Sequence, residues 1–106
     1  VMPSHHETFG LAALEAMACA TPVIVSRVGG LKTFVDDGRV GYLVSRHCPE
    51  PYAQRLDMIL SNPGLMEVMG KAAMERAASM GWSHVAGSTL DLYSDIIRHR
   101  KVTSNV

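Results

Sequence analysis

The chain has 106 residues, 47% of them hydrophobic, which allows one compact domain but not two domains with a cleft between them. Its ten basic and ten acidic side chains cancel, so the charge indicates neither a nucleic acid nor an anionic membrane surface as a partner. Cys19 and Cys48 lie far apart and form no zinc-binding spacing, which favours reduced thiols and a cytoplasmic location. The abrupt start at Val1 predicts a piece of a longer protein, cut near the end of a buried strand.

The first half of the chain predicts alternating strands and helices. Helix-forming residues dominate positions 9–20, and Thr21-Pro22 ends this helix because proline lacks an N–H and clashes with the preceding turn. The β-branched run 23–25 predicts a strand buried on both faces, as in a parallel sheet. A short helix over 31–35 and a second strand over 41–44 follow. This order is typical of a Rossmann-like α/β fold.

The second half predicts three helices, each with one apolar stripe. The stripes comprise Tyr52, Leu56, Ile59 and Leu60, then Leu65, Val68, Met69, Ala72 and Ala73, and finally Ala86, Leu90, Tyr93 and Ile97. Asn62 and Ser83 stand where helix N-caps are expected. We therefore predict a single partial domain over 1–106, in which a Rossmann-like segment (1–46) precedes C-terminal helices (47–106).

The segment PSHHETFGLAALEAMACATPVIVSRVGG, residues 3–30, runs from a predicted strand end through a polar loop into a helix. Ligands of open α/β sheets bind at the carboxyl ends of the strands. The helix directs its unpaired N–H groups and the positive end of its dipole at that loop, which suits a phosphate. Gly10 has no Cβ, so we expect that a diphosphate could approach its backbone closely.

Two glutamates stand out in this segment. Glu15 is the only charged residue between Phe9 and Ala20, on a helix that is otherwise apolar, so we expect it to be mostly buried. A buried carboxylate needs partners, which either ribose hydroxyls or a salt bridge to Arg27 would supply. Glu7 lies where a sugar on a helix-bound diphosphate would project, but on this residue alone helix capping is the better explanation of its position.

The spacing of Glu7 and Glu15 within PSHHETFGLAALEAMACATPVI, followed by VGGL and GYLV, resembles the signature of glycosyltransferase family 4 (group 1), which has the GT-B fold. The resemblance covers about residues 1–46. The later segment GWSHVAGSTLDLYSDII also looks like that family's C-terminus, where the last helix crosses back to the first domain. Within the family, the chain looks like the inositol-phosphate N-acetylglucosaminyltransferases of mycothiol synthesis.

The resemblance implies the C-terminal, donor-binding half of an enzyme that transfers a sugar from a nucleotide diphosphate donor to an acceptor hydroxyl with retention, without a cofactor or catalytic metal. It implies that Glu7 is catalytic, contacting donor-sugar hydroxyls and stabilising the developing oxocarbenium charge. Phe9, Gly10 and Leu11 would offer backbone N–H groups to the sugar and diphosphate. Glu15 would hold the ribose hydroxyls. UDP-N-acetylglucosamine and GDP-mannose both stay open as donors.

Two further features qualify this interpretation. Ala20 stands where relatives usually carry glycine before the TPV segment, which puts the geometry of the helix end in question. His5 and His6 next to Glu7 could suggest a metal site, but adjacent residues rarely converge on one ion, and we expect none.

The resemblance also implies that a diphosphate-neutralising basic pair, the base-binding segment and the N-terminal acceptor-binding domain lie upstream. We therefore expect the fragment alone to be inactive, to bind nucleotide diphosphates weakly and to self-associate through the apolar stripe of its last helix. The alternatives are a non-catalytic nucleotide-binding or regulatory module and a structural protein whose glutamates pair with basic side chains. No apolar stretch here is long enough to span a bilayer, and membrane association of the full-length protein stays open.

Overall fold

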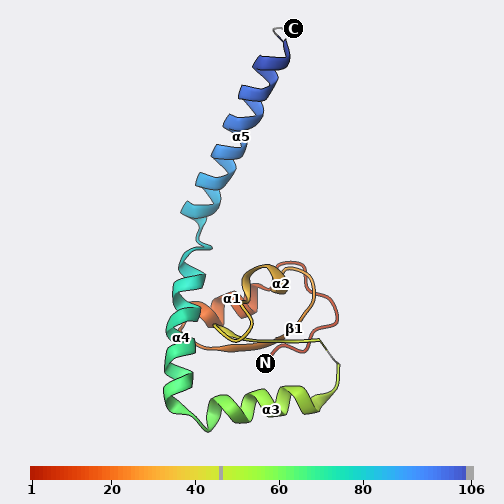
Figure 1. Ribbon diagram of the computed structural model, residues 1–106, viewed down its shortest axis with the longest axis vertical. Helices are drawn as coiled ribbons and strands as arrows, with labels where there is room; N and C mark the ends of the chain where they lie inside the picture. Colours follow the sequence, from red (N-terminus) through yellow and green to blue (C-terminus); the bar gives the residue numbers. More distant parts are fainter. Residues whose placement is uncertain (46, 105–106) are drawn as a thin grey trace.

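The structure is a computed structural model that describes residues 1–45 and 47–104. Its elements, in chain order, are α1 (Leu11–Ala18), β1 (Val23–Ser26), α2 (Leu31–Phe34), β2 (Gly41–Val44), α3 (Pro49–Leu60), α4 (Pro63–Ala78) and α5 (Trp82–Ser104). Figure 1 shows α1 and α2 on one side of the sheet, α3 on the other, and α5 projecting away. The predicted α/β architecture is confirmed. Arg46, at the predicted boundary between the two segments, lies outside the described residues.

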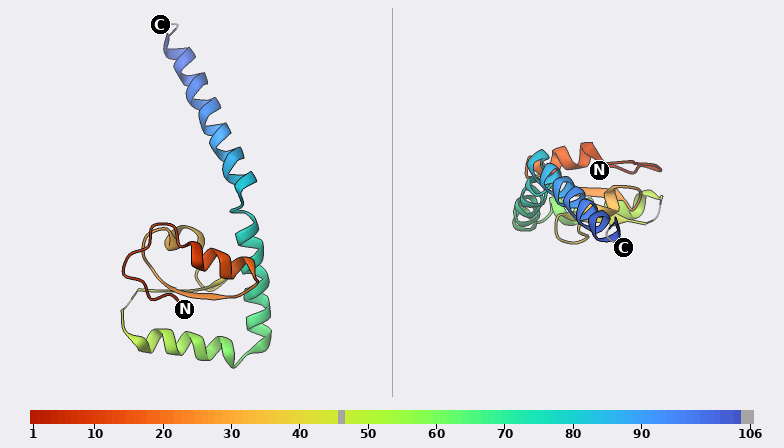
Figure 2. Two further views of the ribbon diagram at one scale, coloured as in Figure 1. Left: turned by 180° about the vertical axis from the view of Figure 1, so that it is seen from behind. Right: turned by 90° about the horizontal axis from the view of Figure 1, so that it is seen from above.

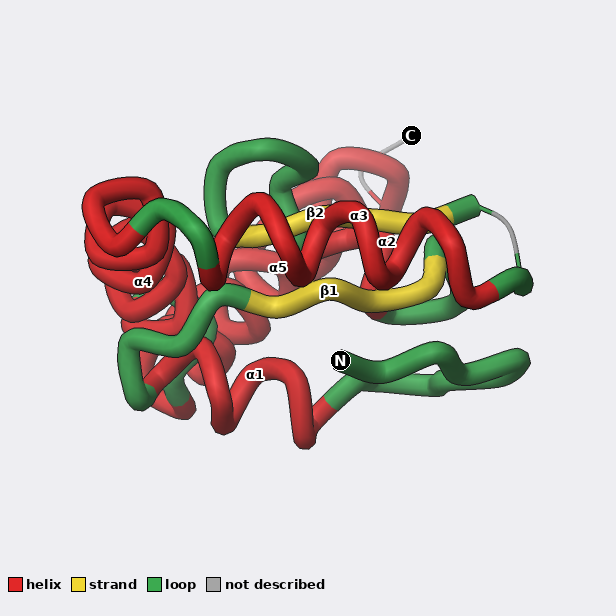
Figure 3. Tube along the Cα trace, turned by 90° about the horizontal axis from the view of Figure 1, so that it is seen from below, coloured by secondary structure: helices red, strands yellow, loops and turns green. Residues whose placement is uncertain are grey.

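The strands β1 and β2 form a parallel two-stranded sheet, whose register begins with Val23 opposite Gly41. The N-terminal segment joins this sheet through one parallel bridge between Met2 and Val25. Figure 3 shows that segment along the side of β1 that faces away from β2. Strand β1 therefore lies between two neighbours, which explains why all four of its residues are buried.

The side chains of β1 alternate between two apolar layers, because successive residues of a strand point to opposite faces of a sheet. The layer shared with α1 and α2 comprises Ala13, Met17, Val23, Val25, Leu31, Phe34, Val35, Val40 and Ala73. The layer shared with α3 comprises Ile24, Tyr42, Val44, Tyr52, Ile59 and Met69. Helix α4 runs past the sheet and contributes to both layers, through Ala73 and Met69. The prediction of a strand buried on both faces is confirmed.

Helix α1 is shorter at both ends than the predicted range 9–20. Gly10 precedes it with φ 74° and ψ 38°, a left-handed conformation that cannot continue a helix toward the N-terminus. Ala20 follows it with φ 58°, and Thr21 donates its N–H to the Ala16 carbonyl at 3.1 Å. This is the bonding pattern of a Schellman motif, whose left-handed position favours glycine. Ala20, which was expected to affect the geometry of the helix end, therefore holds a backbone conformation that glycine adopts more easily.

The predicted helix caps have opposite outcomes. Asn62 caps α4 as expected, because its side chain accepts the N–H of Leu65 at 3.1 Å. The prediction for Ser83 was wrong, since α5 already begins at Trp82 and Ser83 lies within its first turn. The carbonyl of Gly81 accepts the N–H of Val85 instead.

Helix α5 stands clear of the rest of the molecule (Figures 1 and 2). The molecule measures 63 Å along its longest axis but 27 Å and 18 Å along the others. Leu90, Tyr93 and Ile97 of the predicted stripe are all more than half exposed. Among the described helices, none combines the length and apolarity needed to cross a membrane.

Candidate functional site

Glu7 lies in the loop between the N-terminal segment and α1, where it rests on the loop that follows β1. Gly30 donates its N–H to the Glu7 carbonyl at 3.2 Å. A Cβ on Gly29 would lie 1.6 Å from that carbonyl oxygen, and a Cβ on Gly30 would lie 2.5 Å from the carbonyl oxygen of Thr8. The two loops therefore touch backbone to backbone, and only glycines allow the contact. The carboxyl end of β1 thus positions Glu7.

The side chain of Glu7 is directed at the N-terminus of α1. Its Oε1 accepts the N–H of Gly10 at 3.3 Å, and the residue is half-buried. The N–H groups of Leu11, Ala12 and Ala13 have no partner in the described part of the chain, as expected for a first helical turn. A carboxylate and free N–H donors at the positive end of a helix dipole therefore lie side by side.

Gly10 serves the site in a different way from the one expected. It is buried, and a Cβ there would point at the core, 2.5 Å from Cδ2 of Leu31 and 3.1 Å from the ring of Phe34. The interpretation that its missing Cβ makes room for a diphosphate was therefore wrong. Glycine is needed at this position for its positive φ and for close packing on α2.

An open pocket of about 330 Å³ has Glu7 in its lining, and we call it the Glu7 pocket. Its lining comprises Met2, His6, Glu7, Thr8, Phe9, Leu11 and Ala12. The pocket thus brings together three of the five predicted site residues, and Gly10 contacts one of them. The sequence interpretation omitted Ala12, although the rule of free N–H groups at a helix start includes it. No lysine or arginine belongs to this lining, so an anion in the pocket would be bound by the free N–H groups and the positive end of the helix dipole.

Glu15 is exposed, so the expectation of burial was wrong. Helix α1 packs on the core through the buried Ala13 and Met17 and the partly buried Leu14 and Ala16, while Glu15 on another side is exposed. An otherwise apolar helix therefore does not imply that all of its faces are covered. Helical spacing places Glu15 one turn after Leu11 on the same face, about 6 Å along the axis. It thus extends the side of α1 that lines the Glu7 pocket.

Neither glutamate is engaged in an ion pair within the described residues. Arg27, the suggested partner of Glu15, instead lies 4.0 Å from Asp37 and donates its Nε–H to the Ser45 hydroxyl at 3.2 Å. The structural alternative, in which both glutamates neutralise basic side chains, therefore lacks its expected contacts. The capping alternative for Glu7 agrees with its hydrogen bond to Gly10.

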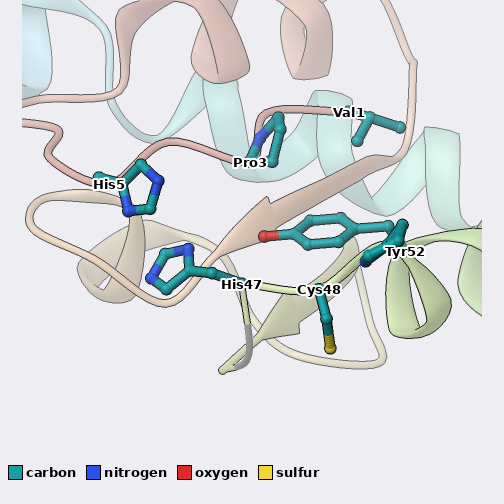
Figure 4. A pocket seen from close by; sticks show the side chains of 7 residues that line it. Val1, Pro3, His5, His47, Cys48 and Tyr52 are labelled. Carbon is teal, nitrogen blue, oxygen red and sulfur yellow. The ribbon is translucent and has the colours of Figure 1, made fainter.

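The two adjacent histidines line different pockets. His6 belongs to the Glu7 pocket, whereas His5 lines a second pocket of about 390 Å³ and stacks on His47 with ring centroids 4.4 Å apart. Figure 4 shows this stack, with the hydroxyl end of Tyr52 on the same side. That hydroxyl is buried and has no hydrogen-bond partner among the described residues. Nowhere in residues 1–45 and 47–104 do three His, Cys, Asp or Glu side chains gather as a metal site would require.

The apolar side chains around Glu7 are strongly exposed. Phe9 is 70% exposed and Leu11 60%, although they flank a half-buried carboxylate. Both also line a larger, mainly apolar pocket of about 670 Å³, which extends toward Phe34 and Met80. The site is therefore bordered by apolar side chains that no other described residue covers.

The sequence has clear relatives. The pattern of the family described as "Glycosyl transferases group 1" matches residues 1–76. The D-inositol 3-phosphate glycosyltransferase of Streptomyces bingchenggensis (strain BCW-1) is 45% identical over 105 residues, covering 98% of this chain and 23% of that protein. The D-inositol 3-phosphate glycosyltransferase 2 of Catenulispora acidiphila is 50% identical over 94 residues, covering 89% and 22%. The chain thus spans less than a quarter of the length of these curated relatives.

Solved structures show the same similarity. Sucrose-phosphate synthase from Thermosynechococcus elongatus superposes with a TM-score of 0.78 at 38% identity, covering 92% of this chain and 25% of that one. The C-terminal domain of a glycosyl transferase group 1 family protein from Francisella tularensis superposes with a TM-score of 0.67 at 34% identity, covering 73% and 40%. The chain therefore shares its fold with part of the first protein and with the C-terminal domain of the second.

Proposed function

This chain belongs to the group 1 glycosyl transferases, and we propose that it is the donor-binding part of a retaining GT-B enzyme of family 4. The proposed reaction moves a sugar from a nucleotide diphosphate to an acceptor hydroxyl. The observation that carries the proposal is the half-buried Glu7 carboxylate beside the free N–H groups at the start of α1. Cleavage of the bond between sugar and diphosphate develops positive charge on the sugar and negative charge on the diphosphate. In the pocket, the carboxylate would stabilise the first and the N–H groups the second.

In this proposal the first turn of α1 binds the diphosphate. Leu11 and Ala12, whose N–H groups are free, line the Glu7 pocket, and Phe9 from the loop lines it as well and offers a further backbone N–H. The Gly10 N–H is already bonded to Glu7, so its contribution is to orient the carboxylate. As negative charge grows on the leaving diphosphate, these fixed donors and the helix dipole stabilise it increasingly.

Glu15 takes the ribose in this proposal. It lies one helical turn beyond Leu11, is exposed, and makes no ion pair among the described residues. A free carboxylate can accept hydrogen bonds from two neighbouring hydroxyls at once. The exposure that contradicted the expectation of burial is what access by a nucleotide requires.

For the substrates, we propose UDP-N-acetylglucosamine as the donor and an inositol phosphate as the acceptor, with GDP-mannose as the competing donor. Relatives of similar sequence named D-inositol 3-phosphate glycosyltransferase support this choice of acceptor. We propose that the acceptor-binding domain lies outside this chain, so that the fragment alone is inactive. No cofactor or catalytic metal takes part in the proposed reaction, whose location is the cytoplasm; the free thiols of Cys19 and Cys48 are compatible with that compartment.

Two matched glutamate variants of the full-length enzyme test the proposal. We expect Glu7→Gln to lower kcat about 100- to 1,000-fold with little change in the donor KM, because its stabilisation grows in the transition state. We expect Glu15→Gln to raise the donor KM about tenfold while kcat changes little, because ribose binding is uniform along the reaction. Steady-state kinetics with both donors, and the anomeric configuration of the product by NMR, provide the measurements.

Each result has a contrary counterpart. If Glu7→Gln changed only KM, the carboxylate would be a binding group and its catalytic role would be wrong. An inverted product would exclude retention. A full-length protein that binds the nucleotide but transfers no sugar would favour the non-catalytic module.

A further inference from the structure

Ser26, the last residue of β1, is a polar residue in the apolar core. Its exposed fraction is 0%, and it is the one buried polar residue among those whose burial the structure describes. Its hydroxyl lies 2.6 Å from the Ser4 carbonyl oxygen and 3.1 Å from that of Met2. Its backbone N–H also donates to the Met2 carbonyl, at 3.1 Å. Ser26 therefore binds the segment that leads to Glu7 through both its backbone and its side chain.

Apart from the stacking of His5 on His47, few contacts hold the segment between Met2 and Glu7. In the described part of the chain, the Ser26 hydroxyl makes the one hydrogen bond to residues 3–6. The bridge of Met2 to β1 fixes one end of the segment, and the Gly30 N–H fixes the Glu7 carbonyl at the other. The 2.6 Å contact is short even for a bond from a hydroxyl, so it restrains the middle of the segment closely.

Burial in a strand does not by itself explain a serine here. A small apolar residue would fill the same core position and is common in buried strands. Alanine would, however, leave the partly buried Ser4 carbonyl without its donor, which is unfavourable. The hydroxyl therefore holds residues 3–6, beside the strand, through its bond to the Ser4 carbonyl.

We propose that Ser26 is a positioning residue for Glu7, whose hydroxyl sets the path of residues 3–6 and thereby the place of the carboxylate in the Glu7 pocket. The inference rests on the proposed catalytic role of Glu7. Ser26 is fully buried and so does not touch the donor, which distinguishes it from a catalytic residue. A displacement of a catalytic group by a fraction of an ångström lowers turnover far more than it lowers binding.

The test is a double-mutant cycle in the full-length enzyme with Ser26→Ala, Glu7→Gln and the combined variant. We expect Ser26→Ala to lower kcat roughly tenfold, with the donor KM and the dissociation constant of UDP unchanged. In the Glu7→Gln background we expect the same change to leave kcat as it is, because the group that Ser26 positions has already lost its charge. Ser45→Ala is the matched control: it removes a hydroxyl just after the neighbouring strand β2, which contacts Arg27 and not the Glu7 loop.

Two results would overturn the positioning role. One is an equal loss of kcat in both backgrounds, which a purely structural effect predicts. The other is an unchanged kcat in Ser26→Ala. Failure of the proposed function has a different signature, because Glu7→Gln alone would then keep wild-type turnover, and the positioning role would fall with it.

Discussion

Helices α1 and α5 both present apolar side chains to solvent, yet they relate to the rest of the chain in opposite ways. Helix α1 packs on the core through Ala13 and Met17, and its exposed Leu11 borders a pocket with a carboxylate. Helix α5 projects away, and its described side chains from Ser83 to Arg100 are all exposed (Figure 1). Exposed apolar side chains that line a pocket together with a carboxylate, as on α1, favour a ligand site, whereas the exposed stripe of α5 has no such polar group beside it and favours contact with another apolar surface.

The largest loss of activity is expected where the Glu7 loop before α1 contacts the backbone of Gly29. Gly29→Ala would place a Cβ 1.6 Å from the Glu7 carbonyl oxygen, at a φ of 48° that already disfavours a side chain. The Glu7 loop must then move away from β1. We expect kcat/KM of the full-length enzyme to fall at least about 100-fold, because a displacement of about 1 Å in a catalytic group has effects of that size.

Gly38→Ala is the matched control for this variant. Gly38 also has a positive φ, of 83°, but a Cβ there would meet no atom within 4 Å. Both substitutions therefore introduce backbone strain, and only one introduces a clash with the Glu7 loop. We expect Gly38→Ala to keep kcat/KM within a few-fold of wild type. Equal losses in the two variants would mean that strain, and not the loop contact, controls activity.

The exposed apolar stripe of α5 predicts that the isolated chain associates with itself. Leu90 and Tyr93 are 65% and 61% exposed on one stripe of α5, so burying them against a second copy is favourable. We expect concentration-dependent association in sedimentation velocity, and we expect Tyr93→Glu to weaken it at least about tenfold, since the interface would then bury a charge.

Ser88→Glu provides the control, because helical spacing places Ser88 away from the Leu90–Tyr93 stripe. It adds the same charge to the same helix and should leave the association constant nearly unchanged. Equal weakening by both variants would show that net charge governs the association. A wild-type chain that stays monomeric at all concentrations would show that the stripe needs a different partner.

The sequence predicted features that depend on local pattern. The run 23–25 indicated a strand buried on both faces, because a continuous β-branched stretch has no solvent face. Prediction from the sequence failed for features that depend on contacts with distant segments of the chain. Glu15 was expected to be buried because its helix is apolar, but no part of the chain that the structure describes covers its side chain. The exact first residue of α1 was missed, because Gly10 just before it has a positive φ and packs closely on α2.

The candidate site shows the same division. The position of Glu7 in the loop before α1 could be predicted from the sequence, because the loop and the helix belong to one short segment. The support from Ser26 and from Gly29 could not be predicted, since these residues follow Glu7 by about twenty positions, and only the folded sheet brings Ser26 to Ser4 and Gly29 to Glu7. A glycine pair after a buried strand was the available signal.

The smallest predicted effect concerns the far end of α1, where Ala20 holds φ 58°. The left-handed conformation costs an ordinary residue roughly 1–2 kcal/mol. Glycine avoids that cost, but its greater freedom in the unfolded chain offsets roughly 0.5–1 kcal/mol of the gain. We therefore expect Ala20→Gly to raise the free energy of unfolding by about 0.5–1 kcal/mol, measured by urea denaturation in the Tyr93→Glu background to keep the chain monomeric.

The matched control lies two residues earlier, at Ala18, which is exposed like Ala20 but belongs to the last turn of the helix. Ala18→Gly removes the same methyl group from a right-handed position, where glycine is less favourable than alanine by up to about 1 kcal/mol. The two substitutions should therefore change the free energy of unfolding in opposite directions, because only the backbone conformation differs between the sites. If Ala20→Gly destabilised the chain as Ala18→Gly does, the alanine methyl would be contributing contacts that outweigh the strain, and the left-handed close of α1 would not be a weak point of the fold.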